Sequence, residues 1–145
     1  MKIICVGKIK KSYLDDGIKY YQKQIPQKLE IIEVEDGKDI TDLSQEGIRI
    51  LSKLEKKDFV ISLVIKGNEL SSEELAQKIE SWLGLGSNIV FVIGGSHGLS
   101  SDVINRSNYQ LSFSKMTFPH QLMRLILVEQ LFRAFSIINN HPYHK

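Results

Sequence analysis

The chain has 145 residues and a formal net charge of +2, with 42% hydrophobic and 25% charged residues. This length suits one domain around one core, and the composition argues against a disordered or fibrous chain. One cysteine excludes an internal disulfide, four widely spaced histidines give no metal-site pattern, and no apolar run is long enough to cross a bilayer. We therefore expect a single cytoplasmic domain over residues 1–145, with no metal and no membrane anchor.

The hydrophobic pattern of the first half predicts five elements. In chain order they are a strand at Lys2–Val6, a helix at Tyr13–Ile25 that Pro26 ends, a strand at Leu29–Val34, a helix capped by Thr41 or Asp42, and a strand at Phe59–Ile65. The strand at Phe59–Ile65 is mostly apolar and rich in β-branched residues, which is typical of a strand buried on both faces.

The second half continues the alternation. In chain order we predict a turn at Gly67-Asn68, a helix capped by Ser71 and ended by Gly84 and Gly86, a strand at Asn88–Ile93, a short helix from Ser100 or Ser101, a strand at Tyr109–Leu111, and a long helix from Pro119 to about Asn139. Alternating strands and helices predict an α/β fold, with a mostly parallel sheet flanked by helices on both faces.

The last helix is apolar around most of its circumference. Its apolar residues are Leu122, Met123, Leu125, Ile126, Leu127, Val128, Leu131, Phe132, Ala134, Phe135, Ile137 and Ile138. A helix of this kind must be covered on all sides, and the sheet of a small domain covers only one. We therefore expect a homodimer, in which Arg124, Glu129, Gln130 and Arg133 serve the function or the interface.

Three strand ends are candidates for a ligand site, because ligands of open α/β sheets bind beyond the carboxyl ends of the strands. They are Leu63–Gly67, Ile93–Gly98 and the loop Phe113–Phe118. Gly94 and Gly95 let a backbone approach a ligand, although a glycine pair alone more often only turns the chain. The segment lacks a dinucleotide fingerprint and a phosphate-binding loop, which argues against a flavodoxin-like nucleotide binder.

The charged and titratable residues near the two ends give weaker signals. Residues 1–28 have seven lysines against two aspartates, and residues 106–145 have five basic residues against one glutamate, which would suit phosphate if the ends converge. His97 and His120 are acid–base candidates, or else structural side chains. Arg124 follows His120 by one helical turn, so the two share a face.

The C-terminal segment combines two histidines, a tyrosine and a lysine directly after the apolar helix. Tyr143 is suited to stacking on a base, and His144 and Lys145 are suited to contacting phosphate. The alternative is a loosely ordered end.

Four segments together resemble a known family. They are Val92–Ser100, Leu111–Arg124, Glu129–Ala134 and Asn140–Lys145. They are similar to the corresponding motifs of the large-subunit ribosomal RNA methyltransferase H family, in the SPOUT superfamily of knotted methyltransferases. The resemblance runs the full length of the chain. One departure is Val64, where family members often have an aspartate.

The resemblance implies an enzyme that uses S-adenosylmethionine to methylate N3 of a pseudouridine in large-subunit ribosomal RNA, which we expect it to recognise in the assembled ribosome. It also implies a C-terminal trefoil knot, in which the last helix passes through a loop of the chain, and a homodimer. The alternative function is a non-catalytic, ribosome-associated RNA-binding module, which would need no cofactor pocket.

The resemblance also implies which residues form the site. The cofactor contacts would come from Leu63, Gly94, Phe113, Ser114, Lys115, Met116, Thr117 and Phe118. Backbone groups would bind the adenine and apolar side chains would pack on its faces. We further expect His144 of one subunit to lie near the other subunit's cofactor, with Tyr143 and Arg124 positioning the target nucleotide.

Overall fold

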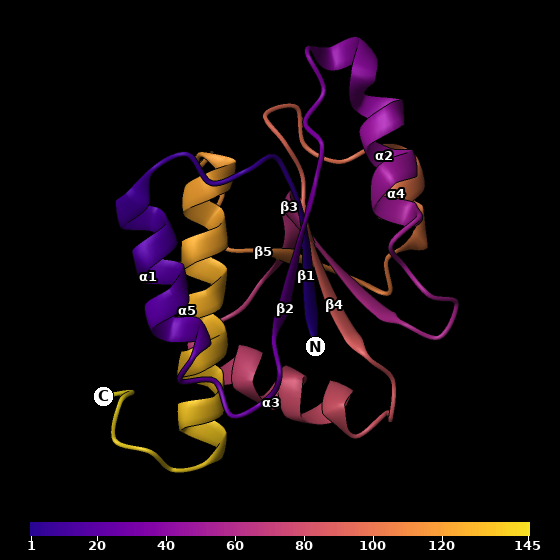
Figure 1. Cartoon of the computed structure of the whole chain (residues 1–145). Helices are drawn as coiled ribbons and strands as arrows, with labels where there is room; N and C mark the ends of the chain where they lie inside the picture. The colour runs from indigo at the N-terminus through magenta and orange to yellow at the C-terminus, as the bar shows by residue number, and fades with distance from the viewer.

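Five parallel strands form one sheet in the computed structural model, which describes residues 1–145 (Figure 1). The strands are β1 (Lys2–Val6), β2 (Glu30–Val34), β3 (Phe59–Glu69), β4 (Ile89–Ile93) and β5 (Tyr109–Ser112). Their order in the sheet is β2-β1-β4-β3-β5, and every pairing is parallel. The predicted α/β class with a parallel sheet is confirmed.

Helices cover both faces of this sheet. They are α1 (Ser12–Gln22), α2 (Leu43–Leu51), α3 (Ser72–Leu83), α4 (Ser101–Arg106) and α5 (His120–Ile138), with a short 3₁₀ turn at Ile40–Asp42 before α2. Helices α1, α3 and α5 lie on one face, and α2 and α4 lie on the other (Figure 1). Each face of the sheet has its own hydrophobic cluster beneath these helices.

Local sequence explains most of the boundaries. Ser71 and Glu74 form the capping box that starts α3, because each side chain accepts a hydrogen bond from the other residue's backbone N–H. Helix α1 ends at Gln22, earlier than the predicted Ile25. Pro26 disfavours the helical conformation for Ile25, and the chain leaves the helix through tighter bonds such as Ile25 N–H to the Gln22 carbonyl, at 3.3 Å.

The predicted turn at Gly67-Asn68 is wrong, because both residues lie inside β3. The pairing of β3 with β5 shifts register between Leu63 and Asn68, which marks a β-bulge. A Cβ atom at Gly67 would lie 2.8 Å from the carbonyl carbon of Leu111, so glycine at this position allows the β5 backbone to pass. Residues 64–67 are therefore left out of the pairing with β5, which resumes at Asn68 and Glu69.

Helix α5 packs against α1, α3 and the sheet, but part of its circumference is only half-covered. Its buried residues include Leu127, Val128, Leu131 and Phe135, whereas Leu122, Leu125 and Ile126 are only half-buried. Half-buried apolar side chains of this kind are what the predicted dimer would cover, although the dimer itself stays a prediction. So does the trefoil knot. No helix in the structure has the length and apolar character needed to span a membrane.

Candidate functional site

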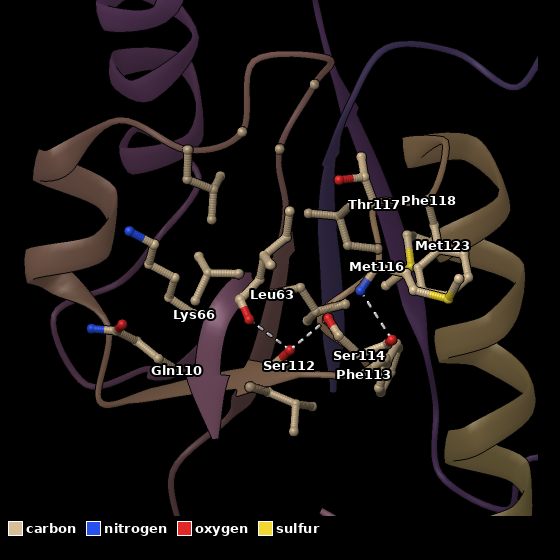
Figure 2. Close-up of a pocket in the computed structure, with 18 of the residues that line it drawn as sticks. Leu63, Lys66, Gln110, Ser112, Phe113, Ser114, Met116, Thr117, Phe118 and Met123 are labelled. Atoms are coloured by element: carbon tan, nitrogen blue, oxygen red, sulfur yellow. Dashed lines mark hydrogen bonds between the residues drawn. The ribbon is translucent and has the colours of Figure 1, made fainter. Parts of the chain in front are cut away.

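A cavity of about 550 Å³ lies at the carboxyl edge of the sheet, where the three predicted strand ends meet (Figure 2). Its lining includes all the residues predicted to contact a cofactor except Lys115: Leu63, Gly94, Phe113, Ser114, Met116, Thr117 and Phe118. Lys115 belongs to the same loop but does not line the cavity. The β3 bulge supplies one wall, the β4–α4 loop a second, and the β5–α5 loop a third.

The Gly94–Gly98 loop forms a wall made of backbone. Gly95 and Gly98 pair as an isolated antiparallel bridge, in which the Gly98 N–H donates to the Gly95 carbonyl at 3.1 Å. The loop therefore folds back on itself, and a Cβ atom at Gly94 would overlap the carbonyl oxygen of Gly98. Gly94 thus does more than turn the chain, because only a residue without a Cβ atom permits the Gly98 carbonyl to approach so closely beside the cavity.

The Ser112 hydroxyl fastens the β5–α5 loop to the β3 bulge. Its Oγ lies 2.9 Å from the carbonyl oxygen of Ile65 and 3.1 Å from that of Ser114, and the Met116 N–H donates to Ser114 Oγ at 3.0 Å (Figure 2). Met116 is 70% exposed and stands at the rim. Ser112 and Met123, which also line the cavity, were missed in the sequence, where no pattern distinguishes them from ordinary core residues.

The two histidines singled out in the sequence lie at the same edge of the sheet. His97 lines the cavity from the β4–α4 loop. His120 begins α5 and lies beside Gly7. A Cβ atom added to Gly7 would lie 3.5 Å from Nε2 of His120. Arg124 also reaches Gly7, so the prediction that His120 and Arg124 share a face of the helix is confirmed.

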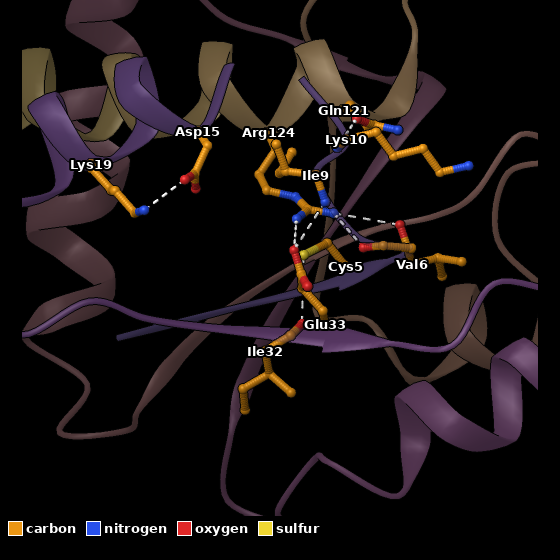
Figure 3. Close-up of polar contacts among 11 residues, drawn as sticks. Cys5, Val6, Ile9, Lys10, Asp15, Lys19, Ile32, Glu33, Gln121 and Arg124 are labelled. Carbon is orange, nitrogen blue, oxygen red and sulfur yellow. Dashed lines mark hydrogen bonds and ion pairs between the residues drawn. The ribbon is translucent and has the colours of Figure 1, made fainter. Parts of the chain in front are cut away.

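Arg124 is 1% exposed and does not line the cavity. Its guanidinium donates to Glu33 Oε1 at 2.5 Å and to the Gly7 carbonyl at 2.8 Å, and its Nε has no partner (Figure 3). A side chain buried in this way offers no surface to a nucleotide. Arg124 therefore holds the end of β1 in place, and the expectation that it contacts the target nucleotide needs to be revised to a positioning role.

The C-terminal half of α5 has a network of polar side chains. Arg133 pairs with Glu129 at 2.5 Å and lies over the Tyr143 ring, 4.8 Å from its centroid. The Tyr143 hydroxyl donates to Glu129 Oε1 at 3.0 Å, and its ring packs on Phe132. Burial is the main cause that raises the pKa of Tyr143, and the contacts with Tyr21 and Glu129 add to it. The phenol therefore keeps its proton at neutral pH.

His144 completes this network. Its Nε2 lies 2.8 Å from Glu73 Oε1 on α3, and its Nδ1 lies 3.2 Å from a guanidinium nitrogen of Arg133. The pKa of Glu73 is lowered, first by a hydrogen bond from its own backbone N–H and then by His144. The C-terminal segment is thus docked on its own helices. The Tyr143 hydroxyl meets α5 at Glu129, so the segment folds back along the C-terminal half of the helix. Neither Tyr143 nor His144 lines its own chain's cavity.

Comparisons with known proteins place this geometry in a family. A family model described as predicted SPOUT methyltransferase matches residues 1–144. Ribosomal RNA large subunit methyltransferase H of Acholeplasma laidlawii is 53% identical over 146 residues, covering 100% of this chain and 99% of that protein. The proteins of the same name from Finegoldia magna and Enterococcus faecalis are 52% and 49% identical, each covering at least 98% of both chains.

The fold is also found among solved structures. The SpoU methyltransferase AviRb from Streptomyces viridochromogenes superposes with a TM-score of 0.52, at 9% sequence identity, over 96% of this chain and 60% of that chain. At this level of identity the likeness concerns the fold alone.

Proposed function

This chain belongs to the ribosomal RNA large subunit methyltransferase H family of SPOUT methyltransferases, and on that basis we propose that it transfers a methyl group from S-adenosylmethionine to N3 of a pseudouridine in large-subunit ribosomal RNA. The observation that supports this most is the cavity, because three strand ends far apart in the sequence converge on it. A module that only binds RNA has no need of such an enclosure.

The residues around the cavity fit an adenosyl group. Its volume lies within the roughly 300–1,000 Å³ that is usual for small-molecule sites. Leu63, Phe113 and Phe118 offer apolar surface for the faces of a base, and the three glycines of the Gly94–Gly98 loop offer backbone groups with no side chain of their own. When bound, the cofactor supplies an activated methyl group. The chain contributes binding, orientation and exclusion of water.

We propose that the substrate side of the site comes from a second copy of the chain. Neither Tyr143 nor His144 lines its own chain's cavity, and both are held against α5 and α3 instead. A two-fold dimer that runs the two α5 helices in opposite directions would bring each C-terminal segment to the partner's cavity. In that arrangement Tyr143 and His144 position the target nucleotide, and Arg124 positions the end of β1 beneath it. The half-buried apolar side of α5 supports such a pairing.

The protonation of Tyr143 suggests its role. Because burial raises the pKa of Tyr143, its hydroxyl stays protonated and acts as a hydrogen-bond donor rather than as a base. The other role open to Tyr143 is stacking by its ring. The N3 proton of the target must leave as the methyl arrives, and the structure assigns no base for that step. In the free chain, Glu73 and Arg133 hold the His144 ring against α3 and α5.

Truncation after Asn140 tests this assignment. We expect methylation of large ribosomal subunits to fall by at least 100-fold, while calorimetry shows S-adenosylmethionine binding within about twofold of the full-length chain. Methylation at the full-length rate would exclude a role for the C-terminal segment. If the full-length protein itself showed no binding heat, the protein would be a non-catalytic RNA-binding module instead.

We also propose that the substrate is the assembled ribosome or subunit, because a small domain of modest charge has little surface for reading naked RNA. Comparing initial rates on protein-free ribosomal RNA and on whole ribosomes decides this. Equal rates on the two would contradict it.

A further inference from the structure

The β1–α1 loop, Gly7 to Lys11, presents three lysines at the edge of the sheet where the cavity opens. Lys8, Lys10 and Lys11 are exposed, and none of them forms an ion pair. Other lysines, including Lys2 and Lys19, pair with carboxylates. The loop thus combines three unneutralised positive charges within four residues.

The backbone of this loop is held in one position although its lysine side chains are exposed. The Lys10 N–H donates to Gln121 Oε1 at 2.9 Å, and the Ile9 N–H donates to Glu33 Oε1 at 3.3 Å (Figure 3). The Ile9 side chain packs against the hydrophobic core between the lysines. In Figure 3 the Lys10 side chain extends away from these contacts. A loop that served only solubility would not need its backbone fastened at consecutive residues.

Helix α5 connects the loop to the cavity. Gln121 and Arg124, which hold Lys10 and Gly7, lie in the first turns of α5, and Met123 between them lines the cavity. The loop and the cavity also share the carboxyl edge of a parallel sheet, since β1 ends at Val6 beside the end of β4 at Ile93. The lysines therefore have a fixed position relative to the site of chemistry.

We propose that Lys8, Lys10 and Lys11 form a phosphate-binding element that docks the backbone of ribosomal RNA beside the cavity. This inference rests on the proposed function, because it takes RNA as the substrate. Lysine ammonium groups bind phosphate as point charges and release counterions from the nucleic acid. A loop that is already ordered by Gln121 and Glu33 loses little conformational entropy when it binds, which favours affinity.

The test replaces all three lysines by glutamine and compares the variant with a matched control. The control is the triple variant Lys53→Gln, Lys56→Gln and Lys57→Gln, which makes the same charge change on exposed lysines before β3, at the opposite edge of the sheet. The dissociation constant for purified large ribosomal subunits is measured over a range of KCl concentrations, using the full-length proteins.

We expect the loop variant to bind subunits at least tenfold more weakly near 0.1 M salt. We also expect its plot of log affinity against log salt to be shallower by about 2 to 3 units, because each phosphate contact contributes about 0.7 to 0.9 to that slope. The control should stay within about twofold of the wild type. Equal losses in the two variants, or an unchanged slope in the loop variant, would overturn the proposal.

Two further measurements separate this inference from the proposed function. S-adenosylmethionine binding by calorimetry should be the same in both triple variants and in the wild type, which shows that the cavity is intact. If wild-type protein binds subunits but does not methylate them, the proposed function fails, while the salt dependence still decides the role of the loop.

Gln121→Ala tests the fastening of the loop without changing any charge. We expect subunit affinity to fall about threefold with the salt slope unchanged, because the lysines remain but the Lys10 backbone is released. Unchanged affinity would show that the lysines act as free charges rather than as a fixed element, and would overturn that part of the inference.

Discussion

The two ends of helix α5 differ in what forms their surface. At its beginning, the Gly94–Gly98 loop, the β3 bulge and the β5–α5 loop surround a cavity with backbone groups and apolar side chains, and Arg124 is buried beneath the end of β1. Along its C-terminal half, partly buried charged and aromatic side chains, Glu129, Arg133 and Tyr143, contact one another. Backbone walls suit a constant ligand such as a cofactor, whereas an adaptable side-chain network suits a large partner that arrives and leaves.

The largest expected effect on ligand binding concerns the cavity end of α5. Gly94→Val places a side chain where the carbonyl oxygen of Gly98 lies, so the loop must open. We expect S-adenosylmethionine affinity to fall by at least 100-fold, about 2.7 kcal/mol, by calorimetry. Gly84→Ala, at the right-handed helical end of α3, is the control and should bind normally. Retained affinity in Gly94→Val would mean that this loop does not form a cofactor wall.

Arg124→Met tests whether the buried arginine holds the cavity end together. The variant removes the donors to Glu33 and to the Gly7 carbonyl, and breaking a buried ion pair costs roughly 3 to 5 kcal/mol. Because Glu33 is 34% exposed and can be rehydrated, we expect the free energy of unfolding to fall by about 3 kcal/mol, the low end of that range. Urea unfolding at one fixed protein concentration measures it. Lys19→Met breaks the exposed ion pair with Asp15 and should be as stable as the wild type. Equal losses of stability in the two variants would argue against a special role for Arg124.

Glu129→Gln changes the side-chain end alone. Arg133 loses its carboxylate and Tyr143 its charged acceptor, and a hydrogen bond to a charged group contributes roughly 1.5 to 3 kcal/mol. We expect methylation of ribosomal subunits to fall about tenfold with cofactor affinity unchanged. The exposed Glu80→Gln serves as the control. A loss of cofactor affinity in Glu129→Gln would show that the two ends of α5 do not act separately.

The two ends also differ in how far the sequence predicts them. The cavity end follows from local rules, because apolar strands followed by glycine mark strand ends, and parallel strands bring those ends to one edge. Gly67 was misread as a turn because its close neighbour, β5, lies more than forty residues later in the chain. The burial of Arg124 depends on Glu33, which is 91 residues away, and no local pattern reveals such a partner.

The C-terminal segment shows the same limit. Its composition indicated that it had a role, but not that Tyr143 packs on Phe132 or that His144 reaches α3. These contacts depend on the angle at which the chain leaves α5, where Asn140 adopts a positive φ of 53°. The trefoil knot was inferred from the resemblance alone, because physical rules would not have suggested a knot, whereas the dimer was also expected from the apolar circumference of the last helix.

The smallest expected effect concerns how firmly His144 is docked on Glu73. The pKa of Glu73 lies below 4.5, so its contacts stabilise the folded chain above that pH and are lost as pH falls through the lowered value. The first cause is its own backbone N–H and His144 comes second, so His144→Ala should raise the pKa only part of the way to 4.5. Carboxyl titration by NMR measures this. A full return of the Glu73 pKa to 4.5 would make His144 its main partner, and the C-terminal segment would then be tightly fixed. That result would contradict the adaptable surface inferred for this end of α5.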